Sequence, residues 1–206
     1  GAGRGGGEDR WQTRAVDRGD DAGGAGPTPA GPVLLDEARG LRLRPWVRAD
    51  APALVAAWAV PGIADRSRLP APRSPEAAAR WIGGAAVRMA AGVAVDLVVA
   101  PPEGPEVWGE VGLVRRRWRS ADGGGERTVH EVGWWVLPEH RGRGLAASAA
   151  EVLGRWARAE LGIDRWVARI GPRNLASQRV ADRLGLARRG RADDDHDLWV
   201  GPVPGG

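Results

Sequence analysis

Apolar and polar positions alternate along this chain with two different periods, and the changes between them predict a mixed α/β domain. Segments in which every second residue is apolar are typical of half-buried strands, whereas an apolar stripe at intervals of three and four is typical of helices. The predicted strands are Leu41–Arg44, Val93–Ala100, Val107–Arg116, Thr128–Leu137, Asp164–Ile170 and, after one further short strand, Asp197–Val200. The predicted helices are Ala49–Val60, Pro75 to about Ala90, a long segment that ends at Gly162, and Leu175–Leu184.

The ends of these helices carry recognisable capping residues. Ser74 is a predicted N-cap with Pro75 in the first turn, and Asp50 is the predicted cap of the first helix. Gly162 and Gly185 stand where a helix is expected to close in the left-handed conformation. The caps therefore support the boundaries that the apolar pattern indicates.

Three consecutive strands between residues 93 and 137 are joined by short turns, which predicts an antiparallel meander. The whole order is β-α-α-β-β-β-α-β-α-β-β. We therefore expect an α/β (α+β) fold with a mixed, mostly antiparallel sheet of about six or seven strands, flanked by about four helices. Residues 1–38 are rich in Gly, Ala and Pro with little apolar periodicity, so we predict a disordered tail there and a single domain over residues 39–206.

Composition excludes several classes of site. The 206 residues include no Cys, so disulfides and thiolate metal ligands are ruled out. The histidines His130, His140 and His196 lack metal-ligand spacing, and we expect no metal. No apolar run approaches the ~20 residues that span a bilayer. We predict a cytoplasmic protein without a membrane partner.

The charge of the chain comes from an unusual choice of residues. All 30 basic residues are Arg, set against 26 acidic residues, and the net charge is +4. The absence of Lys, Phe and Tyr suggests a G+C-rich coding sequence, so the Arg content is weak evidence for nucleic-acid binding. Arg115–Arg119 is the one dense basic run, and we interpret it as a solvated strand end. Nucleic acid is therefore not an expected partner.

The segment around residues 138–146 predicts an anion-binding turn. A strand breaks at Pro138, and an Arg/Gly turn then opens the long helix. Such a turn directs backbone N–H groups and the positive end of the helix dipole towards one point, which suits a phosphate. Gly142 and Gly144 carry no Cβ that would block the approach. The glycine pair alone is unspecific, since an ordinary strand-to-helix turn is compatible with it.

Four segments together resemble the GCN5-related N-acetyltransferase (GNAT) superfamily, and most of all its ribosomal-protein-alanine (RimJ/RimL-like) branch. The resemblance extends over roughly residues 40–200. The residues that carry it are Glu131-Val-Gly-Trp-Trp-Val-Leu-Pro, Arg141-x-x-Gly144-x-Ala146, Asn174-x-x-Ser177 and Leu184-Gly185-Leu186. It implies a GNAT fold, acetyl-CoA as cosubstrate and direct acetyl transfer to an amine, such as a protein N-terminus or a small molecule.

The resemblance also implies a set of binding residues. The end of the strand would offer free backbone groups to the pantetheine arm, and the turn and first helical residues would hold the pyrophosphate. Asn174 would contact the cofactor, although a plain N-cap explains it too. The implied cofactor-binding residues are Val136, Leu137, Pro138, Arg141, Gly142, Arg143, Gly144, Leu145, Ala146 and Asn174.

Proton transfer is where this sequence departs from a common pattern of the family. Many relatives carry a Tyr seven positions after the Asn as the acid, but Ala181 stands there and the chain has no Tyr. Ser177 is the substitute acid that the branch suggests, and a hydroxyl bonded back to the helix is the alternative. For the base we predict Glu131, with Glu110 on the neighbouring strand as a second candidate, and a strand carboxylate paired with an Arg is the alternative for each. Two further candidate bases are His130 and His140.

The acceptor is the part of the reaction that the sequence constrains least. Arg66, Arg68 and Arg73 in the loop after the first helix favour an acceptor with a carboxylate. An aminoglycoside-type small-molecule acetyltransferase and a non-catalytic acyl-CoA sensor both remain open, and a homodimer is possible.

Overall fold

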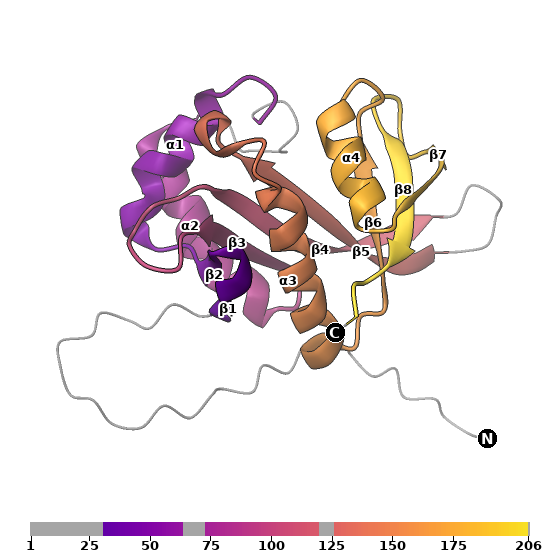
Figure 1. Ribbon diagram of the computed structural model, residues 1–206, viewed down its shortest axis with the longest axis horizontal. Helices are drawn as coiled ribbons and strands as arrows, with labels where there is room; N and C mark the ends of the chain where they lie inside the picture. The colour runs from indigo at the N-terminus through magenta and orange to yellow at the C-terminus, as the bar shows by residue number, and fades with distance from the viewer. Residues whose placement is uncertain (1–30, 64–72, 120–125, 206) are drawn as a thin grey trace.

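The computed structural model describes residues 31–63, 73–119 and 126–205, and these form one sheet flanked by helices (Figure 1). Among the described residues the sheet has eight strands in the order β1-β2-β3-β4-β5-β6-β8-β7. Neighbouring strands are antiparallel except β5 and β6, which are parallel. The bounds are β1 Leu34–Asp36, β2 Leu41–Pro45, β3 Ala94–Ala100, β4 Gly109–Arg119, β5 Glu126–Val136, β6 Arg165–Ile170, β7 Ala187–Arg191 and β8 Asp197–Pro202.

Four α-helices and three short 3₁₀ helices connect these strands in the described ranges. The α-helices are α1 Ala51–Ala59, α2 Pro75–Ala90, α3 Leu145–Leu161 and α4 Leu175–Arg183, and the 3₁₀ helices are η1 Glu37–Arg39, η2 Arg48–Asp50 and η3 Pro138–His140. The side chain of Ser74 accepts a hydrogen bond from the N–H of Ala77, as its predicted N-cap role requires. Gly162 and Gly185 adopt positive φ at the ends of α3 and α4, as predicted.

The two faces of the sheet carry different cores. On one face, Val111 and Leu113 of β4 are fully buried with Leu153 of α3. On the other face, Val98 of β3 belongs to a separate apolar cluster with α1 and α2, which includes Trp46. Because side chains alternate along a strand, every second residue of β3, β4 and β5 faces the α1/α2 side.

The sequence-based expectations need two corrections. The ordered domain begins before residue 39, because Leu34–Asp36 pairs with β2 and makes the eighth strand; residues 1–30 lie outside the described residues. Asp50 does not cap α1 with its side chain. Its carboxylate instead accepts hydrogen bonds from the guanidinium of Arg44, at 2.7 and 3.0 Å, and from the N–H of Val47. A buried carboxylate with a guanidinium within reach forms the stronger, charge-assisted bonds.

β5 and β6 separate from one another after a short contact. Within the described residues their parallel pairing is confined to one position, Glu131 opposite Val167. β5 continues to Val136 beside β4, with Trp135 opposite Glu110. The backbone of β5 beyond Glu131 therefore has no strand partner on its β6 side, and this is the gap that the resemblance implies.

Candidate active site

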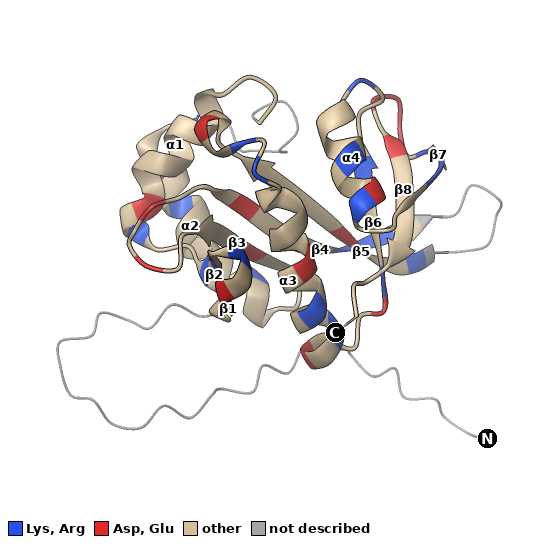
Figure 2. Ribbon diagram, viewed as in Figure 1, with Lys and Arg blue, Asp and Glu red and all other residues tan. Residues whose placement is uncertain are grey.

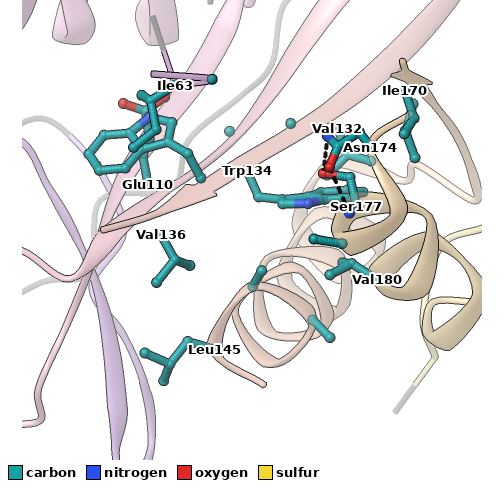
Figure 3. A pocket seen from close by; sticks show the side chains of 18 of the residues that line it. Ile63, Glu110, Val132, Trp134, Val136, Leu145, Ile170, Asn174, Ser177 and Val180 are labelled. Atoms are coloured by element: carbon teal, nitrogen blue, oxygen red, sulfur yellow. Dashed lines mark hydrogen bonds between the residues drawn. The ribbon is translucent and has the colours of Figure 1, made fainter. Parts of the chain in front are cut away.

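A cavity of about 830 Å³ lies at the separation of β5 and β6 and extends under α1 and α2. Figure 3 shows Ile63 and Glu110 at one end, Asn174 and Ser177 at the other, and Trp134 between them. The side chains come from both halves of the chain, so the cavity is a product of the tertiary fold. It has two regions, one at the turn before α3 and one beneath α1 and α2.

The turn before α3 has the form that anion binding requires. Gly142 and Gly144 both adopt positive φ, 77° and 75°, a region that residues with a Cβ rarely enter. The first backbone bond of α3 runs from the N–H of Ser148 to the carbonyl of Gly144. The N–H groups of Leu145, Ala146 and Ala147 precede it, and no described residue accepts from them. These groups and the helix dipole face the cavity, which Gly144, Leu145 and Ala146 line.

The direction of the β5 backbone can be worked out from one hydrogen bond. The N–H of Leu137 donates to the carbonyl of Trp108, so Leu137 turns its backbone towards the β4 side. Since backbone groups of successive residues in a strand point in opposite directions, Trp134 and Val136 turn theirs towards the gap beside β6. The carbonyl of Val136 accepts from Nε of Arg141 at 2.9 Å, which leaves its N–H free.

This geometry changes the predicted set of pantetheine contacts. The N–H of Leu137 is already bonded, and Pro138 has no N–H and begins η3. The N–H of Val136 and both backbone groups of Trp134 are the ones that face the gap. The alternation of the strand could have indicated Trp134 from the sequence. Which of the two alternating sets of residues faces the gap is known only from the hydrogen bond between Leu137 and Trp108.

The predicted charges beside the turn are arranged differently from the expectation. Arg141 is tied to Val136, and the guanidinium of Arg143 lies 4.8 Å from the ring centroid of Trp108. Two arginines that the sequence motifs did not indicate, Arg179 and Arg183 of α4, line the cavity, and Figure 2 shows basic positions on that helix. A Cβ on Gly144 would lie 3.1 Å from Nη1 of Arg183. The spacing of four between the two arginines places them on one face of α4.

Asn174 and Ser177 are brought together at the start of α4. Oδ1 of Asn174 accepts the N–H of Ser177 at 3.2 Å, and Nδ2 donates to Oγ of Ser177 at 2.7 Å. Asn174 is buried and acts as the N-cap. Because Oγ accepts from Asn174, its own proton is available for donation into the cavity.

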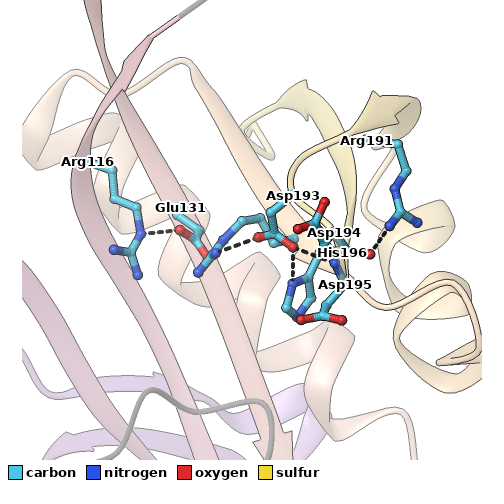
Figure 4. Close-up of polar contacts among 8 residues, drawn as sticks. Arg116, Glu131, Arg191, Asp193, Asp194, Asp195 and His196 are labelled. Carbon is cyan, nitrogen blue, oxygen red and sulfur yellow. Dashed lines mark hydrogen bonds and ion pairs between the residues drawn. The ribbon is translucent and has the colours of Figure 1, made fainter.

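Glu131 lies in a chain of charges that crosses β4, β5 and β6 (Figure 4). Its two carboxylate oxygens accept from Nε of Arg116 and, at 2.9 Å, from Nε of Arg169. Arg169 also bonds Asp193, which bonds His196 at 2.7 Å. The pKa of Asp193 falls to about 2, because these bonds outweigh the opposing effect of its burial. Both oxygens of Glu131 are thus occupied, which disfavours it as a proton acceptor.

Glu110 is in the opposite situation. It lines the cavity, and no ion-pair partner for it occurs among the described residues. Burial raises the pKa of Glu110 well above its ordinary value, and the nearby charge of Asp96 raises it further; Arg88 and the indoles of Trp46 and Trp135 act against this. A carboxylate with a raised pKa is a better base near neutral pH than an ordinary one.

Two negative findings hold for the described ranges. No group of three or more His, Asp or Glu side chains there could hold a metal ion. No helix in that part of the chain is long and apolar enough to cross a membrane.

Comparison with known proteins adds a family match. The model of the acetyltransferase (GNAT) domain matches residues 40–187 of the chain. The uncharacterized N-acetyltransferase YnaD of Bacillus subtilis (strain 168) is 33% identical over 66 residues, which are 32% of this chain. That match spans 38% of the length of YnaD.

Several solved structures have a similar fold. An acetyltransferase from Agrobacterium tumefaciens is 24% identical, with a TM-score of 0.65 over 87% of this chain and 99% of its own. Mycobacterium smegmatis RimJ in complex with CoA-disulfide is 19% identical, with a TM-score of 0.62 over 84% of this chain and 86% of its own. The ribosomal-protein-S5-alanine acetyltransferase of Vibrio fischeri is 18% identical, with a TM-score of 0.64 over 84% of this chain and 97% of its own. At these identities the likeness shows the fold alone.

Proposed function

Because this chain belongs to the GNAT family of acetyltransferases, we propose that it transfers an acetyl group directly from acetyl-CoA to a primary amine. The observation that supports this most strongly is the junction of two features in one cavity. The free N–H groups before α3 suit a pyrophosphate, and the unpaired backbone of β5 suits the pantetheine arm. The two features meet at Val136, which lines the same cavity.

Acetyl-CoA would lie with its pyrophosphate over the turn and the first residues of α3. The N–H groups of Gly142 to Ala146 would bind it, with Arg183 and Arg179 adding charge from α4. Trp134 and Val136 would bond the pantetheine arm. The N–H of Val136 would also stabilise the oxyanion that forms on the thioester carbonyl. Asn174 would close the site while it caps α4.

The proton steps need one acceptor and one donor. The acceptor ammonium loses a proton, the neutral amine attacks the thioester carbonyl, and the leaving thiolate of CoA gains a proton. Ser177 is the proposed donor, since its hydroxyl proton is free. For the base we place Glu110 ahead of Glu131, the residue that the sequence predicts. Glu110 is opposite Trp135 and next to Val136, whereas Glu131 is five residues back along β5, about 16 Å in an extended strand.

Acetyl-CoA titration and a CoA-release assay test the proposal together. Calorimetry of the full chain with acetyl-CoA should show one site, and CoA release should depend on an added amine. Failure to bind acetyl-CoA or any other acyl-CoA would overturn the assignment. Binding without release across peptide, small-molecule and aminoglycoside amines would instead favour a non-catalytic acyl-CoA sensor, which the missing Tyr keeps open.

A cytoplasmic location and a homodimer stay predictions. Gel filtration of the full chain with light scattering would decide the second.

A further inference from the structure

The cavity has a second region, which lies on the α1/α2 face of β3, β4 and β5. Val98 is opposite Glu110, and Glu110 is opposite Trp135, so the three share this face. Residues paired directly across two strands have Cβ atoms about 5 Å apart. The remaining walls come from α1, from the residues that follow it and from α2. They are Leu54 and Trp58 of α1, Ile63 after it, and Trp81 of α2. We call this region the acceptor chamber.

The floor of the acceptor chamber is made of glycine. Gly112 and Gly133 pair across β4 and β5, two residues from Glu110 and Trp135 and therefore on the same face. Gly133 is exposed, and a Cβ built on it would meet no described atom within 4 Å. The φ of Gly133 is not positive, so the backbone conformation at this position does not require a glycine. The missing side chain of Gly133 leaves an open trough beside Glu110, whereas a Cβ on Gly112 would lie 3.1 Å from the carbonyl oxygen of Val95.

The charges around the trough do not balance. Nε and Nη2 of Arg88 both bond Oδ2 of Asp96, at 3.0 and 2.8 Å, and Nη1 bonds the carbonyl of Trp81 at 3.1 Å. Each nitrogen of the Arg88 guanidinium is thus bonded, and none of these bonds goes to Glu110. Oδ1 of Asp96 accepts no hydrogen bond from a described residue and lies 3.4 Å from a Cβ placed on Gly112. One guanidinium thus faces two carboxylates, and Glu110 lacks a cation of its own within the described part of the chain.

Tryptophan surrounds this negative charge. The rings of Trp46 and Trp81 meet edge to face with centroids 5.8 Å apart, and the centroids of Trp46 and Trp135 are 6.2 Å apart. Nε1 of Trp46 is buried without a hydrogen-bond partner of normal geometry, and it lies near enough to Glu110 to stabilise its charge. Aromatic faces beside a carboxylate are the surroundings that bind an organic ammonium ion.

We propose that the acceptor chamber selects a small-molecule amine with an apolar body and no carboxylate next to the amino group. The inference rests on the proposed acetyl transfer and names its acceptor class. The ammonium lies between Glu110 and Trp135, beside Val136. The body extends over Gly133 towards Val114, whose strand partner Glu131 is neutralised by its two arginines. A carboxylate on the same carbon would be forced against Glu110 and Asp96, where like charges repel at low dielectric.

This inference departs from the expectation drawn from the loop after α1. Arg66 and Arg68 lie outside the described residues. Arg73 is described, and its Nη1 bonds the carbonyl of Trp58 at 3.4 Å. From β3 and β4, the carboxylates of Asp96 and Glu110 line the cavity, and the guanidinium of Arg116 is paired with Glu131. The charge beside Glu110 therefore favours a cationic acceptor.

A matched pair of acceptors tests the class directly. Phenethylamine and phenylalanine differ in one carboxylate, and we expect kcat/KM for phenethylamine to be at least a hundredfold higher, measured by CoA release with saturating acetyl-CoA. An alanine-terminated peptide and an aminoglycoside complete the panel. Equal or better turnover of phenylalanine, the peptide or the aminoglycoside would overturn the inference. Loss of acetyl-CoA binding would instead strike the proposed function, so the two failures are distinguishable.

Variants of the floor test the location. Gly133→Leu should fill the trough and lower kcat/KM for phenethylamine at least a hundredfold, while the Kd for acetyl-CoA stays within twofold. Gly83→Leu is the control, because Gly83 is exposed on α2 and a Cβ placed there would also meet open space. Should Gly133→Leu bind acetyl-CoA and keep full turnover, the chamber is not the acceptor site. Gly133→Val, a smaller change that still extends beyond Cβ into the trough and suits a strand, gives the same comparison if the leucine variant does not fold.

Discussion

The two ends of the cavity are built in different ways. The end at which we propose that acetyl-CoA binds, the cofactor end, consists mainly of backbone groups from one continuous segment, β5, η3 and the start of α3. The acceptor chamber consists of side chains from β3, β4, β5, α1 and α2, which are far apart in sequence. The first can be exchanged between proteins as a motif, whereas the second changes with single substitutions. The difference explains why a shared fold accommodates many acceptors.

The largest expected effect comes from closing the cofactor end. Gly144→Val forces a β-branched residue to a φ of 75° and places its Cβ 3.1 Å from Arg183. We expect the affinity for acetyl-CoA to fall at least a hundredfold, about 3 kcal/mol, by calorimetry.

Gly162→Val is the matched control for that variant. Gly162 has a φ of 66° at the other end of α3, with open space around it, so the cost of a side chain to the backbone conformation is similar. The turn before α3, which we call the backbone cradle, is unchanged in this variant. Equal loss of acetyl-CoA binding in both variants would mean that helix stability, and not the cradle, is responsible.

The next largest effect should be a difference between the two ends of the cavity in how acceptor turnover and acetyl-CoA binding depend on pH. Burial and Asp96 raise the pKa of Glu110, so the base form is lost as the pH falls through a value well above the ordinary ~4.3. Below that value kcat/KM for the amine should fall about tenfold per pH unit beyond the ordinary protonation of the amine. The Kd of acetyl-CoA should change much less over this range.

Glu110→Gln completes that test. The variant should lose most of its turnover, and its kcat/KM should no longer show the fall at low pH that is assigned to Glu110. Its stability should also depend less on pH, because a carboxylate with a raised folded pKa destabilises the fold as the pH rises through that pKa. If Glu131→Gln removes this fall in kcat/KM and Glu110→Gln does not, Glu131 is the base, as the sequence predicts.

The same contrast explains how much of the molecule the sequence could predict. The helices, the meander and the turn at Gly142 and Gly144 follow from local periodicity and capping, and the structure has them. β1 was missed because three residues carry no period, and Asp50 was misread because its partner Arg44 is on another element. Pairing of Glu131 with an Arg is an alternative that the sequence leaves open, but the two partners, Arg116 and Arg169, depend on how β4 and β6 align, which no local pattern reveals.

A smaller effect is expected at the head of α4. Ser177→Ala removes the proposed acid but leaves Oδ1 of Asn174 bonded to the backbone N–H of residue 177. We expect kcat to fall by about a hundredfold, the lower end for general acid catalysis, and the Kd of acetyl-CoA to stay within threefold. Unchanged kcat would leave Ser177 with a structural role only.

The smallest effect should come from the arginines of α4, which the sequence motifs did not indicate. Arg183→Ala removes an exposed guanidinium beside Gly144, and we expect acetyl-CoA to bind about fivefold more weakly, roughly 1 kcal/mol, because solvent screens an exposed charge. The loss should shrink as salt is added. Arg189→Ala on the exposed strand β7 is the control, and it should leave affinity unchanged. A larger loss for Arg183→Ala than for Gly144→Val would mean that side-chain charge, and not the backbone cradle, dominates the cofactor end.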